Sequence, residues 1–217
     1  MTARDVRLIR EVTDLTGLRR LLRLSAARTS GELNVSDFAR NVDLPVETCR
    51  RYLALLETVF LHHLVPAWSR NLTAKVRHRP KLHHTDTGLA AHSLGVNAAG
   101  LARPGSPQAG PLLETFVASE LARQLTWSDT DATLMHWSDR GGAEVDLILE
   151  ASDGRVVAIE VKAAKDVNEA DSRWLRAMRD RLGPQFVVGA VLHCGDHPRS
   201  LSERIISLPI AALWSAS

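Results

Sequence analysis

Apolar residues recur at helical spacing through the first half of the chain. This pattern predicts three helices, at 16–31, 34–44 and 44–61, and then two extended segments, at 64–68 and 75–86. Ser36 is placed to cap the second helix, and Pro45 stands near the start of the third. Tyr52, Leu55 and Leu56 share one face of the third helix, so we expect that face in a core.

Helix, short helix, turn, helix and β-ribbon is the element order of a winged helix-turn-helix. In that fold the third helix would contact nucleic acid through Thr48, Arg50 and Arg51. The ribbon would form a wing that carries four basic residues, Lys75, Arg77, Arg79 and Lys81. Small winged-helix units also serve as protein–protein adaptors, and these cations would then form a solvated face.

Histidines are concentrated around the two extended segments, at His62, His63, His78, His83 and His84. Their spacing matches no standard zinc pattern. We therefore expect them on a polar or nucleic-acid-facing surface rather than around a metal ion.

Gly, Pro and small residues gather between Gly95 and Pro111, which predicts a linker at 96–110. Beyond it, helices are predicted at 110–127 and 168–183, and strands at 132–138, 143–151, 155–164, 185–195 and 204–214. Strands in a row, then a helix and another strand, indicate a mixed sheet with flanking helices. The predicted fold is α/β (α+β), with a helical winged-helix-like domain at 1–95 and a second domain at 111–217.

Composition restricts the class of protein. With 45% apolar and 24% charged residues, the 217-residue chain is expected to be globular. No apolar run approaches the roughly 18–20 residues that cross a bilayer, and the N-terminal residues do not resemble a signal peptide. Only two cysteines occur, Cys49 and Cys194, so we expect a reducing cytoplasm and no disulfide scaffold.

Charge is distributed unevenly along the chain. Residues 1–103 hold sixteen Lys and Arg against nine Asp and Glu, a net +7, whereas residues 104–217 hold eleven against sixteen, a net −5. A basic half indicates a polyanion partner, and an acidic half indicates bound cations or a solvated surface.

Three charged residues interrupt the apolar runs on either side of the Ser152–Gly154 turn: Asp146, Glu160 and Lys162. Residues two apart in a strand share a face, so Glu160 and Lys162 point the same way, and Ile159 and Val161 point into the core. If the hairpin loop is centred on Asp153, with three or five residues, Asp146 lies directly opposite Glu160. A two-residue turn would move Asp146 to the other face.

Two opposed carboxylates repel each other unless a cation lies between them. Oxygen ligands suit Mg²⁺ or Mn²⁺, with Asp146 and Glu160 as ligands. Glu114, which the helical pattern places on the inward face of its helix, could supply a third carboxylate. Lys162 could then stabilise charge that develops on a phosphate. This set suits metal-assisted phosphodiester hydrolysis, although Lys162 could equally be the ion-pair partner of either carboxylate.

The motifs GPLLETFVASEL, MHWSDRGGAEVDLILE and VVAIEVKAA resemble the second half of the bacterial and archaeal ATPases that have a DUF4143 C-terminal region. The segments LPVETCRRYLALLETVFLHHLVPAW and RPKLHHTDTGLAAHSLG are similar to the winged-helix and linker segments of that family. The resemblance runs from about Asp5 to Trp214. It implies a PD-(D/E)XK nuclease-like fold in the second domain. Glu114, Asp146, Glu160 and Lys162 would then be the nuclease motif.

The sequence departs from that family at two points. Its members usually carry an AAA-type ATPase module, but this chain has no GxxxxGK[ST] motif. We expect either a stand-alone version or part of a longer ATPase, with a separate ATPase module as a partner. The family often has an arginine after the aromatic residue of the HW strand, where this chain has Ser138, with Arg140 nearby.

Two functions therefore remain open from the sequence. The first is a Mg²⁺-dependent nuclease, with DNA as the expected substrate. The second is an inactive DNA-binding or regulatory module associated with an AAA-type ATPase. An interaction protein that never contacts nucleic acid is a third reading.

Overall fold

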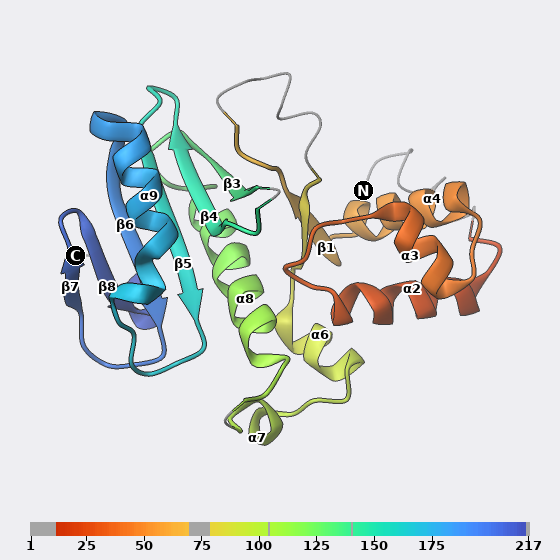
Figure 1. The fold of residues 1–217 in the computed structure, drawn as a ribbon. Helices are drawn as coiled ribbons and strands as arrows, with labels where there is room; N and C mark the ends of the chain where they lie inside the picture. Colours follow the sequence, from red (N-terminus) through yellow and green to blue (C-terminus); the bar gives the residue numbers. More distant parts are fainter. Residues whose placement is uncertain (1–11, 70–78, 104, 140, 216–217) are drawn as a thin grey trace. The chain divides into compact units, whose positions relative to one another are not determined.

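The computed structural model describes residues 12–69, 79–103, 105–139 and 141–215 of the chain. They form two compact units, each with its own core (Figure 1). The first unit comprises Met1–Val65 and Arg79–Ser119, and the second comprises Pro66–His78 and Glu120–Ser217. The chain therefore passes between the units at 65/66, at 78/79 and within a helix at 119/120, whereas the sequence placed the division at the linker 96–110.

Three helices come first among the described residues of the first unit, as predicted: α2 (Leu15–Ala27), α3 (Val35–Val42) and α4 (Val46–Thr58). The predicted cap of α3 was wrong. Asn34, not Ser36, is its N-cap, and the Asn34 side chain accepts a hydrogen bond from the Asp37 amide. The helix starts early enough to include Ser36 because Asn is as good a cap as Ser. Asp43, in the left-handed conformation, ends α3.

The core of the first unit is built from the inward faces of these helices. Tyr52 and Leu56, on the predicted apolar face of α4, are buried with Leu21 and Phe38. The Tyr52 hydroxyl accepts a hydrogen bond from the Asp14 amide at 2.9 Å, so the polar end of this buried ring has a partner. The predicted core of this half of the chain is therefore confirmed.

The two extended segments pair as an antiparallel hairpin of β1 (His62–Val65) and β2 (Lys81–His84). The described residues that directly follow β1 join the second unit. Trp68 is buried in the core of the second unit, next to Met135, and its amide donates a hydrogen bond to the His136 carbonyl. Lys75 and Arg77 lie outside the described residues. The first unit continues through α6 (Thr87–Ser93), α7 (Ala98–Leu101, inside the predicted linker) and α8 (Ala109–Gln124).

A six-stranded mixed sheet is the centre of the second unit. Its strands are β3 (Ala132–Ser138), β4 (Glu144–Ala151), β5 (Val156–Lys162), β6 (Phe186–His193), β7 (Arg199–Ser202) and β8 (Ile205–Pro209). Their order is β3-β4-β5-β6-β8-β7, and β5, β6 and β8 are mutually parallel. Strand β7 was not predicted, because a short polar edge strand has no hydrophobic pattern.

Helix α9 (Arg173–Leu182) connects β5 to β6 and packs on one face of this sheet (Figure 1). Three short 3₁₀ helices, η1 (Glu169–Ser172), η2 (Gly183–Gln185) and η3 (Ile210–Trp214), complete the unit. With seven α-helices and two sheets among the described residues, the protein is the mixed α/β fold expected from the sequence. Within the described part of the chain, no helix is long and apolar enough to span a membrane.

The expectation that the histidines form a surface was wrong. His62, His83 and His84 are buried in the β1–β2 hairpin, His63 is half-buried against the His83 ring, and His78 lies outside the described residues. Hydroxyl groups take the place of water: the Thr115 hydroxyl lies 3.2 Å from His83 Nδ1, and the Ser25 hydroxyl lies 2.9 Å from His84 Nε2. Contacts from helices distant in sequence therefore make burial of these rings possible.

Acid should destabilise the first unit through two of these histidines. Burial, together with the neighbouring His84, lowers the pKa of His62 to about 4, and burial lowers the pKa of His84 to about 4. The unfolded chain binds protons near pH 6.5 and the folded chain does not, so stability is lost as pH falls from 6.5 to 4. We expect the free energy of unfolding to fall by about 2 kcal/mol between pH 7 and 5.5.

Urea unfolding followed by far-UV circular dichroism measures this loss. Replacement of His62 by Gln should flatten the dependence on pH, whereas replacement of the exposed His92 by Asn should leave it as in the wild type. An identical pH dependence in all three proteins would contradict the assignment.

Candidate functional site

The hairpin of β4 and β5 positions the candidate site. Leu147 pairs with Ile159 and Leu149 with Val157, so the two residues of each pair lie equally far from Asp153 in the sequence. This is the pairing expected for a loop centred on Asp153. The loop is Ser152–Gly154. The Ala151 amide donates to the Arg155 carbonyl, and Gly154 has φ of +82°, which favours glycine. The register predicted for an odd loop is therefore confirmed from Leu147 to Glu150, and its continuation by one residue places Asp146 opposite Glu160, whose pKa the nearby Asp146 raises.

The Asp146 carboxylate is held against β5. Its Oδ2 accepts a hydrogen bond from the Val161 amide at 2.8 Å. The Glu160 side chain is buried: the residue is 5% exposed, and its Oε2 accepts a hydrogen bond from Lys162 Nζ at 3.2 Å. Glu160 Oε1 is also buried and has no hydrogen-bond partner among the described residues. Because buried polar atoms normally have a hydrogen-bond partner, a buried carboxylate oxygen without one is a candidate to bind a ligand.

Electrostatics at this site favour a neutral Glu160 when no cation is bound. Burial and then the nearby Asp146 raise the pKa of Glu160 to about 8, although Lys162 opposes the rise. The Lys162 pKa is raised as well, because attraction to Glu160 and Asp146 outweighs the effect of its burial. The Lys162 ammonium thus attracts both carboxylates, whereas the two carboxylates oppose each other's ionisation. Opposing electrostatic effects of this kind are common at functional sites.

Replacement of Glu160 by Gln should stabilise the protein at pH 8. The unfolded carboxyl ionises near 4.5 and the folded one at about 8, so wild-type stability falls as pH rises through this interval. Gln has no such loss, and we expect a gain of about 1–3 kcal/mol in the free energy of unfolding at pH 8. Urea unfolding measures it. A gain of the same size at pH 4 would show that charge is not its cause.

The site lies on the face of the sheet that α9 covers. Val156 and Ala158, which share a face with Glu160, are buried with Leu175 of α9. The sequence placed the core only on the opposite face, with Ile159 and Val161, but both faces are covered. Glu160 is buried for this reason, whereas Lys162, at the end of β5, has a side chain that is 36% exposed.

Glu114 has a different environment. It belongs to the first unit, where Lys81 Nζ donates a hydrogen bond to its Oε1 at 2.8 Å. Both side chains are largely buried, with 3% of Lys81 and 14% of Glu114 exposed. Lys81, expected as an exposed wing cation, is therefore an internal ion-pair partner.

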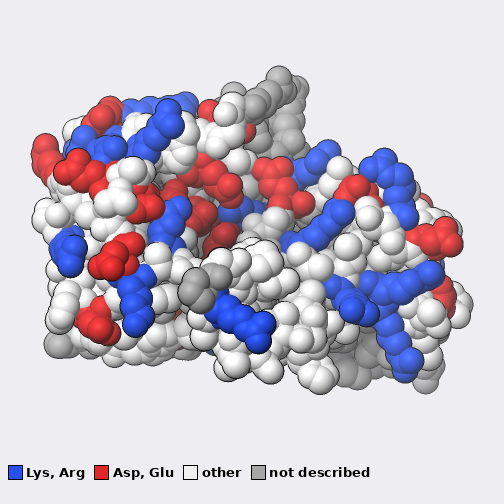
Figure 2. All heavy atoms as spheres, turned by 60° about the horizontal axis from the view of Figure 1, so that its bottom comes forward, with Lys and Arg blue, Asp and Glu red and all other residues white. Residues whose placement is uncertain are grey.

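The other expected nucleic-acid contacts differ in exposure. Arg50 is exposed on α4, with Glu47 as an ion-pair partner at 3.6 Å, and Arg79 is exposed. Thr48 and Arg51 are half-buried, and the Arg51 guanidinium lies over the Tyr52 ring. Figure 2 shows Lys and Arg gathered over the helices of the first unit, where α2 exposes Arg19, Arg20 and Arg23. These three arginines were not predicted as a site from the sequence, although their spacing on one face of a helix was the available signal.

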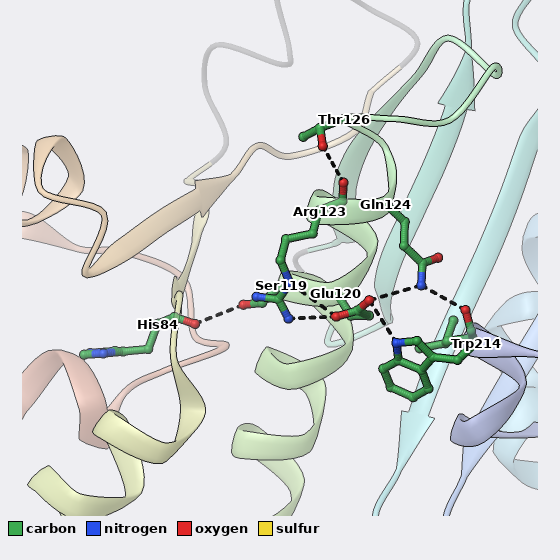
Figure 3. Close-up of polar contacts among 8 residues, drawn as sticks. His84, Ser119, Glu120, Arg123, Gln124, Thr126 and Trp214 are labelled. Atoms are coloured by element: carbon green, nitrogen blue, oxygen red, sulfur yellow. Dashed lines mark hydrogen bonds and ion pairs between the residues drawn. The ribbon is translucent and has the colours of Figure 1, made fainter. Parts of the chain in front are cut away.

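Figure 3 shows a polar cluster on α8 that the sequence did not predict. Glu120 accepts hydrogen bonds from Arg123 and Gln124 and is only 9% exposed. The Trp214 indole also donates a hydrogen bond to this carboxylate, and Gln124 donates to the Leu213 carbonyl. Arg123 above all holds the pKa of Glu120 below its usual value. The cluster fastens η3 to α8, which is a structural role. On the part of α8 in the first unit, Ser119 donates to the His84 carbonyl.

No group of three or more His, Cys, Asp or Glu side chains that could hold a metal ion occurs within the ranges that the structure describes. Asp146 and Glu160 are a pair of oxygen donors, and Mg²⁺ commonly takes only one or two protein carboxylates, with water and substrate phosphate as the other ligands. The donor set therefore fits such an ion. Ser138 lies at the end of β3 opposite Glu144, and Arg140 lies outside the described residues.

Comparison with known proteins identifies related sequences. Residues 109–213 match the family described as "Domain of unknown function (DUF4143)", and residues 1–100 match "Domain of unknown function (DUF8612)". The chain is 32% identical over 176 residues to Uncharacterized protein Rv2008c of Mycobacterium tuberculosis and, to the same extent, to Uncharacterized protein Mb2031c of Mycobacterium bovis. These alignments cover 80% of this chain but 37% of each relative, so the chain spans little more than a third of their length. No solved structure matches. The chain thus carries a DUF4143-type C-terminal region, as the sequence motifs indicated.

Proposed function

We propose that the second unit is a Mg²⁺-dependent nuclease that hydrolyses phosphodiester bonds, with DNA as its substrate. The observation that carries this proposal is the buried Glu160 carboxyl facing Asp146, with Lys162 one step along the same strand face. A fold that only needed stability would place apolar residues at these positions, because the carboxylates oppose each other's ionisation. The PD-(D/E)XK resemblance of this region supports the same function.

Asp146 and Glu160 would hold the metal ion. Mg²⁺, or Mn²⁺ in its place, would supply Lewis acidity to the phosphate and lower the pKa of an attacking water. Glu160 Oε1, which has no hydrogen-bond partner in the part of the chain that the structure describes, would bind the ion, and the Val161 amide fixes the orientation of Asp146. Glu114 is not needed in this account, because its carboxylate already has Lys81 as a buried partner.

Lys162 would act on the reacting phosphate. Its ammonium lies at the end of β5, partly exposed, with Glu160 within hydrogen-bond distance. The Lys162 ammonium would stabilise negative charge that develops on the phosphate oxygens in the transition state.

Incubation of the whole chain with supercoiled and branched DNA tests the proposal. Nicking in the presence of Mg²⁺ or Mn²⁺, and none after EDTA is added, is the expected result. If no DNA or RNA substrate is cleaved at any divalent metal concentration, the second unit is not a nuclease.

The second candidate is a binding or regulatory module that works with a separate AAA-type ATPase, the partner that the resemblance implies. It is favoured by the exposed Arg19, Arg20 and Arg23 on α2 of the first unit, in a three-helix-and-hairpin order like that of winged-helix proteins. DNA affinity that falls steeply with salt, without cleavage, would support it. Both functions belong to the cytoplasm, in keeping with the free thiols of Cys49 and Cys194.

A further inference from the structure

A pocket of about 200 Å³ lies in the second unit, where the parallel strands β5 and β6 end (the lower end of β5 in Figure 1). Its walls include Lys165, Asp166, His193, Asp196 and Arg199. The carboxyl ends of parallel strands are where α/β sheets usually bind ligands. The pocket residues therefore do not include Asp146, Glu160 or Lys162 of the proposed nuclease site.

His193 is a buried polar residue of this pocket, as is Ser207. The residue is 3% exposed, and its Nδ1 accepts a hydrogen bond from the Gly195 amide at 2.9 Å. A neutral ring in this arrangement carries its proton on Nε2. Nε2 is buried and has no hydrogen-bond partner among the described residues. His193 therefore lines the pocket with a ring whose orientation is fixed and whose Nε2 donor has no acceptor among the described residues.

The backbone around His193 is tightly built. A Cβ atom at Gly195 would lie 2.3 Å from the Lys165 carbonyl oxygen and 2.8 Å from His193 Nδ1, so no other residue fits there without a shift. The Cys194 amide donates to the Ala164 carbonyl at 2.8 Å. The loops after β5 and β6 are therefore held together, and the geometry of His193 does not depend on a mobile segment.

The charged groups at the pocket are mixed in sign. Lys165 and Arg199 are exposed cations, and Asp166 and Asp196 are exposed anions. The exposed side chains can turn toward or away from a ligand, but the buried donor cannot. A fixed N–H donor with two flexible cations suits an oxygen-rich anion, and the exposed Asp166 and Asp196 side chains can turn away from it.

The pocket adjoins the proposed nuclease site. His193 pairs in register with Lys162 on the neighbouring strand, and paired residues point to the same face of a sheet. Adjacent strands lie about 4.8 Å apart. An anion in the pocket would therefore lie next to the group that Lys162 contacts.

We propose that this pocket binds a second phosphate of the nucleic-acid strand, next to the one that is hydrolysed. His193 Nε2 donates a hydrogen bond to a phosphate oxygen, and Lys165 and Arg199 neutralise its charge. This inference rests on the proposed nuclease function. The phosphate could be an internal diester or a terminal monoester, and the two make different predictions.

Binding of fluorescein-labelled single-stranded DNA to the whole chain, measured by anisotropy in EDTA, tests the pocket without cleavage. His193→Asn retains an acceptor near the Nδ1 position but removes the Nε2 donor, so it should weaken binding about 5- to 10-fold. His193→Gln can place an amide N–H near Nε2 and should retain more affinity than His193→Asn.

Arg199→Gln should weaken binding and reduce its salt dependence. Arg155→Gln, at the other end of β5, is the matched control and should change affinity by less than about 2-fold. Thermal unfolding confirms that each variant is folded.

The same binding assay distinguishes an internal phosphodiester from a terminal phosphate monoester. Stronger binding of a 5′- or 3′-phosphorylated strand than of an unphosphorylated one, lost in His193→Asn, assigns a terminal monoester. Equal binding of all three strands, weakened by the variant, assigns an internal diester. Unchanged affinity in both His193 variants and Arg199→Gln overturns the pocket even if the wild type cleaves DNA in Mg²⁺. Binding of inorganic phosphate without binding of any strand overturns the nucleic-acid assignment.

Discussion

Asp146→Asn and Glu160→Gln should each lower the rate of Mg²⁺-dependent DNA cleavage by at least about 100-fold. Each substitution removes a charge from the only carboxylates that face each other across the β4–β5 pair within the described residues. Lys162→Met should lower the rate to a similar degree while metal binding remains, because the lysine acts on the phosphate and not on the metal. Single-turnover cleavage with saturating enzyme measures the chemical step directly.

Glu150→Gln is the matched control for this series. Glu150 lies on β4, on the same face as Asp146, but it pairs with Val156, far from Glu160 along the strand. Its replacement should change the cleavage rate by less than about 3-fold, as for a side chain outside the reacting centre. Equal activity in the wild type, Asp146→Asn and Lys162→Met would remove the assigned roles and leave any cleavage to another site or a contaminant.

Glu114→Ala should lower the free energy of unfolding by about 3–5 kcal/mol. The substitution leaves the Lys81 ammonium buried, only 3% exposed, without the carboxylate that accepts its hydrogen bond at 2.8 Å. The loss follows from the cost of a buried charge and does not require a metal ion. Urea unfolding at neutral pH, without divalent metal, measures it.

The double variant Lys81→Met with Glu114→Leu separates the ion pair from packing. Both charges are then absent, and most of the lost stability should return, since an apolar pair of similar volume replaces a buried ion pair at little cost. If Glu114→Ala is as stable as the wild type but loses metal binding, then Glu114 is a metal ligand, as the sequence motif implies, and the ion pair is incidental.

The hairpin could be predicted from sequence because its determinants are local. Ser152, Asp153 and Gly154 are turn residues, which predict the hairpin, but the sequence left the loop length open and gave the register only for an odd loop. The register then fixed which face holds Asp146, Glu160 and Lys162. The helices of the first unit could be predicted for a similar reason, since period and capping residues lie within each segment.

Features made by distant segments could not be predicted. Lys81 looks like a surface cation in sequence and becomes buried only because α8 brings Glu114 to it. His62 and His84 look like polar surface residues, and the partner of His84, Ser25, is far from it in sequence. The departure of the chain after β1 into the core of the second unit, through Trp68, also has no local signal.

Binding of Mn²⁺ to the whole chain, followed by electron paramagnetic resonance at pH 8, tests the central claim most directly. We expect saturable binding of one ion to the wild type and to Lys162→Met, and loss of that binding in Glu160→Gln and in Asp146→Asn. Saturable binding that is equal in the wild type and in both carboxylate variants, or no binding to the wild type, would contradict a metal site between Asp146 and Glu160.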